Sequence, residues 1–302
     1  GATLVAEQLN NWLVSEGDLE VGVLCLIPDG IGGGKSLHRY TVNGVQVFGV
    51  PAALAKNDRG GSSEASSEAL LEQFAAVLDG FAPDLIHVHS IQGIGIDVLD
   101  RARQRNIPYV ITLHDAWWLC PRQFMLTTEG QYCNQRIIDQ QVCAACTGLP
   151  ALVEQRALRM REALEGAHTL LAPSQFFVDL FRSNGYEHVH LNGNGIVQPK
   201  TSRESISSIK SKGNQPIRFG YLGGNVHIKG FGELQTVFRR LSKQPDLKLI
   251  LVDNTLNLGH PSYFAKDLFG LGHVQVVPAF TQATIDEFYN EIDVLLFPTR
   301  WK

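Results

Sequence analysis

Residues 217–230 have the sequence IRFGYLGGNVHIKG, which is the strongest indication of fold class in the chain. The apolar run 217–222 is typical of a buried strand, and Gly223 and Gly224 allow a tight turn before a helical pattern begins. Backbone N–H groups in such a turn can approach an anion closely, and the start of a helix favours negative charge. The stretch therefore predicts a strand–turn–helix unit in which Lys229 meets a phosphate. Such turns also close ordinary strand–helix units, and the residues alone leave both interpretations open.

The rest of the chain repeats this alternation of short apolar runs and helical patterns. We predict further strands at 21–27, 45–50, 85–89, 109–113, 169–172, 247–252, 274–277 and 294–297. Strands that alternate with helices of roughly 10 to 18 residues are typical of parallel sheets built from strand–helix–strand units. The predicted fold class is therefore α/β, with doubly wound parallel sheets.

Length and linker composition predict two lobes. A chain of 302 residues is long enough for two domains of ordinary size. Residues 198–216 are rich in Ser, Lys, Gly and Pro and have little periodicity, as in a linker. We predict a first lobe at 1–196, a linker at 197–216 and a partial second lobe at 217–302. Because a helical pattern starts at once and a buried strand lies near the last residue, we expect both ends of the fold to be truncated.

Composition excludes several classes of function. The 30 acidic residues outnumber the 26 basic ones, so the chain lacks the basic surface of a nucleic-acid-binding protein. No apolar run reaches the roughly 20 residues that span a bilayer, and the first residues do not read as a secretion signal. We predict a cytoplasmic protein that binds no nucleic acid and that works close to a membrane.

Two predicted strands end in polar side chains. His89 and Ser90 end the run 85–89, and His114 and Asp115 follow the next strand. Because the carboxyl ends of parallel strands face the ligand crevice, both histidines are candidate binding residues. An Asp beside a His can hold one tautomer and raise the pKa of the ring, which suits the ring to orienting or deprotonating a hydroxyl. Alternatively, Asp115 caps the turn that follows it.

A cysteine-rich insert at 117–150 follows the second histidine. Cys120, Cys133, Cys143 and Cys146 have the spacing C-x12-C-x9-C-x2-C, which predicts a four-thiolate structural zinc site. Four thiolates leave no open coordination position, so we expect no catalytic metal. Unliganded thiols, or disulfides in an oxidising compartment, are the alternatives.

Four segments together resemble a known family. They are Pro83-Asp84-x-x-His87-x-His89, Thr112-x-His114-Asp115, Ala172-Pro173-Ser174 and Asn194-Gly195-Ile196. They are similar to landmarks of the retaining GT-B glycosyltransferases of family four, some members of which carry a similar cysteine-rich insert. The resemblance implies two Rossmann-like lobes that face a cleft, with His114 as a catalytic residue near donor and acceptor. It also implies that His89, Ser90, Asp115 and Asn194 bind substrate.

The stretch that opens the second lobe resembles the diphosphate-binding segment of the same family. The family pattern is a strand followed by Gly-Arg-x-x-x-x-Lys-Gly, so Lys229 matches the Lys while Gly224 stands where Arg is usual. The resemblance implies a donor site at Gly223, Gly224, Lys229 and Gly230, with Lys229 also catalytic. In the family a Glu-x7-Glu motif follows the strand that corresponds to 294–297, and no Glu lies between that strand and residue 302. Residues Asp253-Asn254-Thr255 replace the family's usual glycine-bearing loop.

The implied activity is that of a retaining glycosyltransferase of the hexosyltransferase type. It would move a sugar from a nucleoside diphosphate sugar to a hydroxyl of a glycan or lipid-linked acceptor. The family suggests polysaccharide or cell-envelope glycan synthesis, with peripheral association at the inner membrane face. The alternatives are an epimerase or phosphorylase on the same fold, and a nucleotide-sugar-binding protein or fragment without transferase activity.

Overall fold

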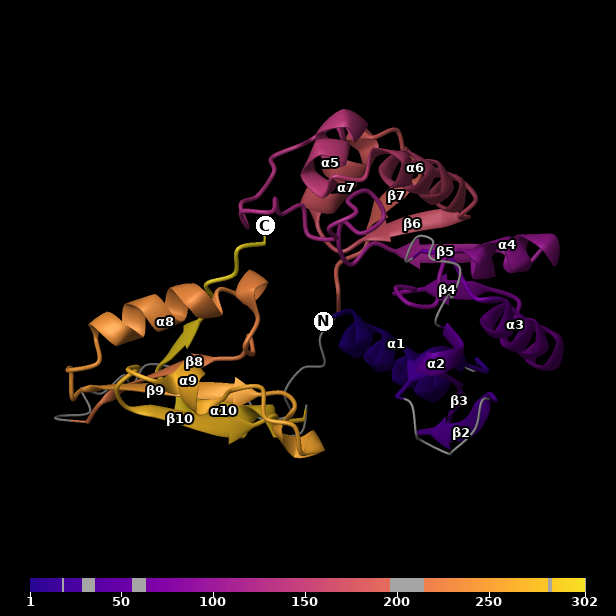
Figure 1. The fold of residues 1–302 in the computed structure, drawn as a ribbon. Helices are drawn as coiled ribbons and strands as arrows, with labels where there is room; N and C mark the ends of the chain where they lie inside the picture. The colour runs from indigo at the N-terminus through magenta and orange to yellow at the C-terminus, as the bar shows by residue number, and fades with distance from the viewer. Residues whose placement is uncertain (18, 29–35, 56–63, 196–214, 282–283, 302) are drawn as a thin grey trace. The chain divides into compact units, whose positions relative to one another are not determined.

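The computed structural model describes residues 1–302 except 18, 29–35, 56–63, 196–214, 282–283 and 302. The chain divides into two compact units (Figure 1). Unit 1 comprises Gly1–Thr128 and Cys133–Val197, and unit 2 comprises Glu129–Tyr132 and Gln198–Lys302. The predicted linker at 197–216 lies outside the described residues, apart from 215 and 216.

Unit 1 contains two sheets with helices between their strands. Its elements are α1 (Ala2–Glu16), β1 (Gly22–Ile27), β2 (His38–Val42), β3 (Val45–Pro51), α2 (Ala52–Ala55), α3 (Glu68–Phe81), β4 (Ile86–Val88), α4 (Asp97–Gln104), β5 (Tyr109–Thr112), α5 (Gln140–Thr147), α6 (Pro150–Glu165), β6 (Thr169–Ala172), α7 (Gln175–Ser183) and β7 (Val189–Leu191). The strand orders are β1-β3-β2 and β4-β5-β6-β7. Every pairing is parallel except that of β2 with β3.

Two strands of unit 1 were not predicted from the sequence. β2 pairs antiparallel with β3 through the turn at Asn43 and Gly44, whose φ angles are 51° and 82°. An Asn-Gly pair between apolar residues is a strong hairpin signal, so the sequence did contain the information. β7 is three residues long and two of them are exposed, which leaves little periodicity to detect. The predicted N-terminal helix and the other strands of unit 1 are confirmed.

Unit 2 contains one parallel sheet. Its elements are β8 (Ile217–Tyr221), the 3-10 turn η1 (His227–Lys229), α8 (Phe231–Arg240), β9 (Leu247–Asp253), η2 (Leu256–Leu258), α9 (Ala265–Leu268), β10 (Val274–Pro278), α10 (Ile285–Glu291) and β11 (Val294–Leu296). The strand order is β10-β9-β8-β11, and all pairs are parallel. The chain therefore passes from one side of β8 to the other between β10 and β11.

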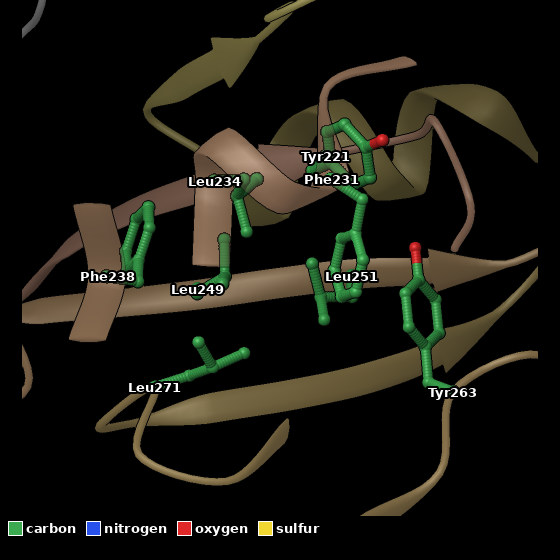
Figure 2. Packing of buried hydrophobic residues seen from close by; sticks show 8 residues of the cluster. All are labelled: Tyr221, Phe231, Leu234, Phe238, Leu249, Leu251, Tyr263 and Leu271. Atoms are coloured by element: carbon green, nitrogen blue, oxygen red, sulfur yellow. The ribbon is translucent and has the colours of Figure 1, made fainter. Parts of the chain in front are cut away.

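The central strand β9 is buried on both faces of this sheet. Leu249 and Leu251 pack on one face against α8, in the cluster that Figure 2 shows. Ile250 and Val252 pack on the other face against Phe288 of α10. Burying a large apolar side chain contributes about 1.5–3 kcal/mol, so an uninterrupted apolar run such as LILV is stable only where both faces are covered. This packing holds the carboxyl ends of β8 and β9, and the loops that follow them, in place.

Among the helices that the structure describes, none is both long and apolar enough to cross a bilayer.

Candidate functional site

In unit 1, the two predicted histidines meet at one edge of a sheet. β4 and β5 are parallel neighbours with Val88 opposite Ile111, so His89 and His114 follow the carboxyl ends of adjacent strands. Both line a small open hollow. Its lining residues are Ala2, His89, Ser90, Ile91, Gln92, His114, Asp115, Trp117 and Trp118.

The two rings are in direct contact. Nδ1 of His89 lies 2.9 Å from Nε2 of His114. His87, two residues before His89 on the same face of the strand, packs against His89 with ring centroids 4.1 Å apart and the rings tilted by 38°. Burial, and then the neighbouring His87 and His114, lower the pKa of His89 to about 3. Burial likewise lowers the pKa of His114, so both rings are neutral at neutral pH.

Asp115 is not hydrogen-bonded to His114, although one of the two interpretations of the sequence expected Asp115 to orient that ring. Its carboxylate accepts hydrogen bonds from the backbone N–H of Trp117, at 2.8 Å, and from Nε2 of Gln123, at 2.6 Å. The expectation that Asp115 raises the pKa of the histidine is wrong, because burial lowers that pKa. The alternative, a carboxylate that organises the following turn, is what the structure shows.

The two remaining predicted substrate ligands differ in position. Ser90 lines the hollow and donates its hydroxyl to Oε1 of Gln92. Asn194 is exposed, follows β7 and is not among the lining residues. The structure thus brings His89, Ser90, His114 and Asp115 together and leaves Asn194 apart from them.

In unit 2, the turn at 223–230 after β8, here called the glycine turn, has glycines that lie very close to neighbouring atoms. Gly224 and Gly230 have φ angles of 66° and 80°, which favour glycine. A Cβ on Gly230 would lie 1.9 Å from the carbonyl oxygen of Pro298, and one on Gly223 would lie 2.1 Å from the hydroxyl of Tyr221. That hydroxyl lies 3.2 Å from the carbonyl oxygens of both Gly224 and Lys229. The turn is therefore fixed before any ligand binds.

A second loop, after β11, lies against this turn and was not predicted from the sequence. Arg300 donates its backbone N–H to the carbonyl of Ile228 at 2.9 Å, and its guanidinium pairs with Glu233 of α8. Nζ of Lys229 lies 5.8 Å from the centre of the Trp301 ring. In the strand order β10-β9-β8-β11, the loops after β8 and β11 flank the point where the order reverses, which is where open α/β sheets bind ligands. The sequence signal for this loop was its position directly after the strand predicted at 294–297.

The four cysteines of the insert lie in unit 1 and form no disulfide. Cys120 and Cys143 are buried, and burial raises the pKa of both thiols. Cys133 and Cys143 are near enough to Cys120 to raise its pKa further. Over the described residues, no three His, Cys, Asp or Glu side chains form a group that could hold a metal ion. The zinc prediction thus has no support from the placement of these thiols and stays a prediction.

A family model described as "Glycosyl transferase 4-like domain" matches residues 1–195. This chain belongs to that family. The match spans most of unit 1, including the hollow with His89 and His114. None of the curated protein sequences is significantly similar to the chain.

Solved structures similar to this glycosyl transferase 4-like chain include sucrose-phosphate synthase from Thermosynechococcus elongatus. The TM-score is 0.64 at 16% identity, and the match covers 100% of this chain and 71% of that one. A second is described as trehalose-6-phosphate from E. coli bound with UDP-2-fluoro glucose, with TM-score 0.53, 10% identity, and coverage of 97% and 74%. A structure of apo OtsA matches with TM-score 0.52 at 10% identity and the same coverage, 97% and 74%.

These likenesses confirm the predicted fold class. The α/β units with parallel sheets are those of the GT-B glycosyltransferases. Family and fold together support a glycosyltransferase of the GT-B type.

Proposed function

We propose that this protein transfers a sugar from a nucleoside diphosphate sugar to a hydroxyl acceptor, with retention of the anomeric configuration. The family match supports the reaction class. A similar structure is described as bound with UDP-2-fluoro glucose, which supports a nucleotide-sugar donor. Retention follows from the resemblance to the family-four enzymes.

The observation that carries the proposal is the fixed turn at the switch point of unit 2. Lys229 and Gly230 end this turn, and α8 begins at Phe231 with no side-chain cap on its first N–H groups. A diphosphate placed here would meet a cation, backbone N–H groups at the start of α8 and the positive end of a helix dipole. Because charge on the leaving diphosphate grows in the transition state, these groups would stabilise that state more than the bound donor.

In unit 1, the hollow that contains His114 is the proposed place for the sugar and the acceptor hydroxyl. Trp117 and Trp118 supply apolar walls, and the histidines and Ser90 supply polar groups. Sites for small molecules commonly combine apolar walls with a few directed polar groups. We extend the proposal to glycan or lipid-linked acceptors of polysaccharide or cell-envelope synthesis, on the strength of the family resemblance.

Titration calorimetry with UDP and GDP tests the donor site. Lys229→Ala is expected to weaken binding of the preferred diphosphate about 10- to 100-fold, since a charge-assisted hydrogen bond contributes about 1.5–3 kcal/mol. Lys243→Ala is the matched control, because Lys243 is an exposed lysine after the other end of α8 and should leave binding unchanged. Failure of both nucleotides to bind the wild-type chain would contradict the proposal.

A transfer assay separates the alternatives. Radiolabelled sugar should pass from the nucleotide to an acceptor hydroxyl, and nuclear magnetic resonance of the product should show the donor's anomeric configuration. Donor binding without turnover, for any acceptor tried, would instead indicate a nucleotide-sugar-binding protein. Interconversion of the donor sugar would indicate an epimerase.

A further inference from the structure

The contact between His89 and His114 admits two arrangements of protons. The 2.9 Å separation of Nδ1 of His89 and Nε2 of His114 is a hydrogen bond, so one nitrogen carries the hydrogen and the other accepts it. A charged His89 is excluded at neutral pH, because burial and the adjacent histidines lower its pKa to about 3. Each ring therefore has one proton, and the direction of this one bond fixes the tautomer of both.

The surroundings of Nε2, the other ring nitrogen of His89, show which of the two proton arrangements is favoured. Nε2 of His89 is buried and has no hydrogen-bond partner among the described residues. If His114 were the donor, His89 would carry its own proton on Nε2, as a buried N–H with no acceptor. If His89 is the donor, Nε2 holds only a lone pair. Buried N–H groups without an acceptor are rarer in folded proteins than acceptors left unsatisfied.

The surroundings keep the His89 ring in this orientation. His87 packs against it, with the rings tilted by 38°. Nε2 of His87 is in turn hydrogen-bonded to Oγ1 of Thr112 on β5, at 2.8 Å. A flip of the His89 ring would place Cδ2 opposite His114 and lose the hydrogen bond between the two histidines.

We propose that His89 is a positioning residue that donates Nδ1–H to Nε2 of His114 and so holds His114 in the tautomer with its proton on Nδ1. In this state neither nitrogen of His114 has a free lone pair. His114 then offers a hydrogen-bond donor to an oxygen in the hollow and cannot accept a proton from a hydroxyl. This consequence rests on the proposed function, and it assigns the removal of the acceptor proton to a group other than His114.

The proposal changes two roles that the family resemblance implied. His89 acts through His114 instead of contacting substrate itself. His114 is a catalytic residue by virtue of a donated hydrogen bond, which would stabilise negative charge on a sugar or phosphate oxygen.

The test is nitrogen-15 spectroscopy of histidine side chains in the free protein near pH 7.5, with the signals of His114 assigned by their loss in His114→Gln. We expect Nδ1 of His114 to have the shift of a protonated ring nitrogen and Nε2 that of an unprotonated one. The opposite assignment in the wild type would overturn the proposal.

Two substitutions of His89 by residues of equal size make the test specific to the direction of the bond. His89→Asn keeps an N–H near the position of Nδ1 and should preserve the tautomer of His114. His89→Asp can only accept, so it should move the proton of His114 to Nε2. An unchanged tautomer in a folded His89→Asp protein would contradict the proposal. If that variant does not fold, the wild-type and His89→Asn spectra decide.

His190→Asn is the control, because His190 is exposed on β7 and is not among the lining residues of the hollow. It should leave the spectrum of His114 unchanged. These measurements need neither donor nor acceptor. A proton on Nε2 of His114 would therefore contradict this inference alone. Absence of nucleotide binding would contradict only the proposed function.

Discussion

The guanidinium of Arg156 and the carboxylate of Glu64 form a buried ion pair, with Nε and Oε1 2.7 Å apart and side chains only 4% and 7% exposed. Arg156 also donates to the carbonyl oxygen of Trp117 and lies over its ring, 5.2 Å from the ring centre. Trp117 lines the hollow that contains His114. The ion pair thus supports one wall of the candidate site from α6.

We expect Arg156→Met to destabilise unit 1 by about 3–5 kcal/mol, because it leaves the Glu64 carboxylate buried without a partner. Replacing both residues with Met should recover most of that loss, since both buried charges are then removed. Arg161→Met is the control on the same helix. Its pair with Glu165 is more than half exposed, so less than about 1 kcal/mol should be lost. Urea unfolding measures all three, and equal losses for Arg156→Met and Arg161→Met would contradict the account.

Two glycines near the start of α8 should respond oppositely to substitution. Gly230→Ala should break the turn, because its φ is 80° and a Cβ would lie 1.9 Å from the Pro298 carbonyl oxygen. Gly232 lies inside α8 with nothing within 4 Å of a Cβ, so Gly232→Ala should stabilise the protein by about 0.5–1 kcal/mol.

Thermal unfolding and UDP or GDP titration of both variants test this expectation. Gly230→Ala should lose stability and nucleotide affinity together, whereas Gly232→Ala should gain stability. A Gly230→Ala protein that binds nucleotide as well as the wild type would show that the turn does not shape the donor site.

Asp253, at the end of β9, should make the stability of unit 2 sensitive to acid. Burial alone would raise the pKa of this carboxyl group, but hydrogen bonds from the N–H and hydroxyl groups of Thr255 and Ser262 outweigh it and lower the pKa to about 2. A carboxyl group whose pKa is lower in the folded state stabilises the protein above its unfolded pKa of about 3.8. That stabilisation should be lost as the pH falls from roughly 4 towards 2.

Asp253→Asn should therefore lower the urea midpoint at pH 5 and reduce the further drop between pH 5 and pH 2.5. Asp246→Asn is the control, since Asp246 is exposed in the turn before β9 and should leave the wild-type pH dependence intact. An Asp253→Asn protein with the full wild-type drop would show that another group is responsible.

The proposed zinc site can be tested by elemental analysis. Protein purified without chelators should contain one zinc per chain, and Cys143→Ser should abolish the metal, because structural zinc requires four ligands. Cys25→Ser should retain it, since Cys25 lies in β1, outside the insert. Thiolate binding of zinc also predicts loss of metal at acidic pH. A metal-free wild-type protein with native circular dichroism would refute the proposal.

The sequence predicted most strands because a buried parallel strand leaves a local mark. The run at Leu249–Val252 is apolar at consecutive positions, and the structure buries all four side chains. The glycine turn could also be located, since Gly230 occupies a backbone conformation and a contact that a side chain would not fit. β2 was missed although Asn43-Gly44 signalled it, and β7 was missed because it has only three residues, two of them exposed.

The candidate site was predicted less completely. Strand ends placed His89, His114 and Lys229 in loops that open parallel sheets use for ligands. Which side chains these residues contact was not determined by their local sequence. Asp115 is adjacent to His114 in sequence and bonds to Gln123 instead.

Local patterns were enough to infer the α/β alternation, the strand–turn–helix at Lys229 and the histidines at the ends of β4 and β5, because hydrophobic periodicity and backbone conformation are properties of neighbouring residues. The folded chain was needed to see that His89 meets His114 across 25 residues, that Arg156 pairs with Glu64, and that the backbone of Arg300 bonds to the turn after β8. Those contacts depend on strand register and helix packing, which bring together side chains that no local pattern relates.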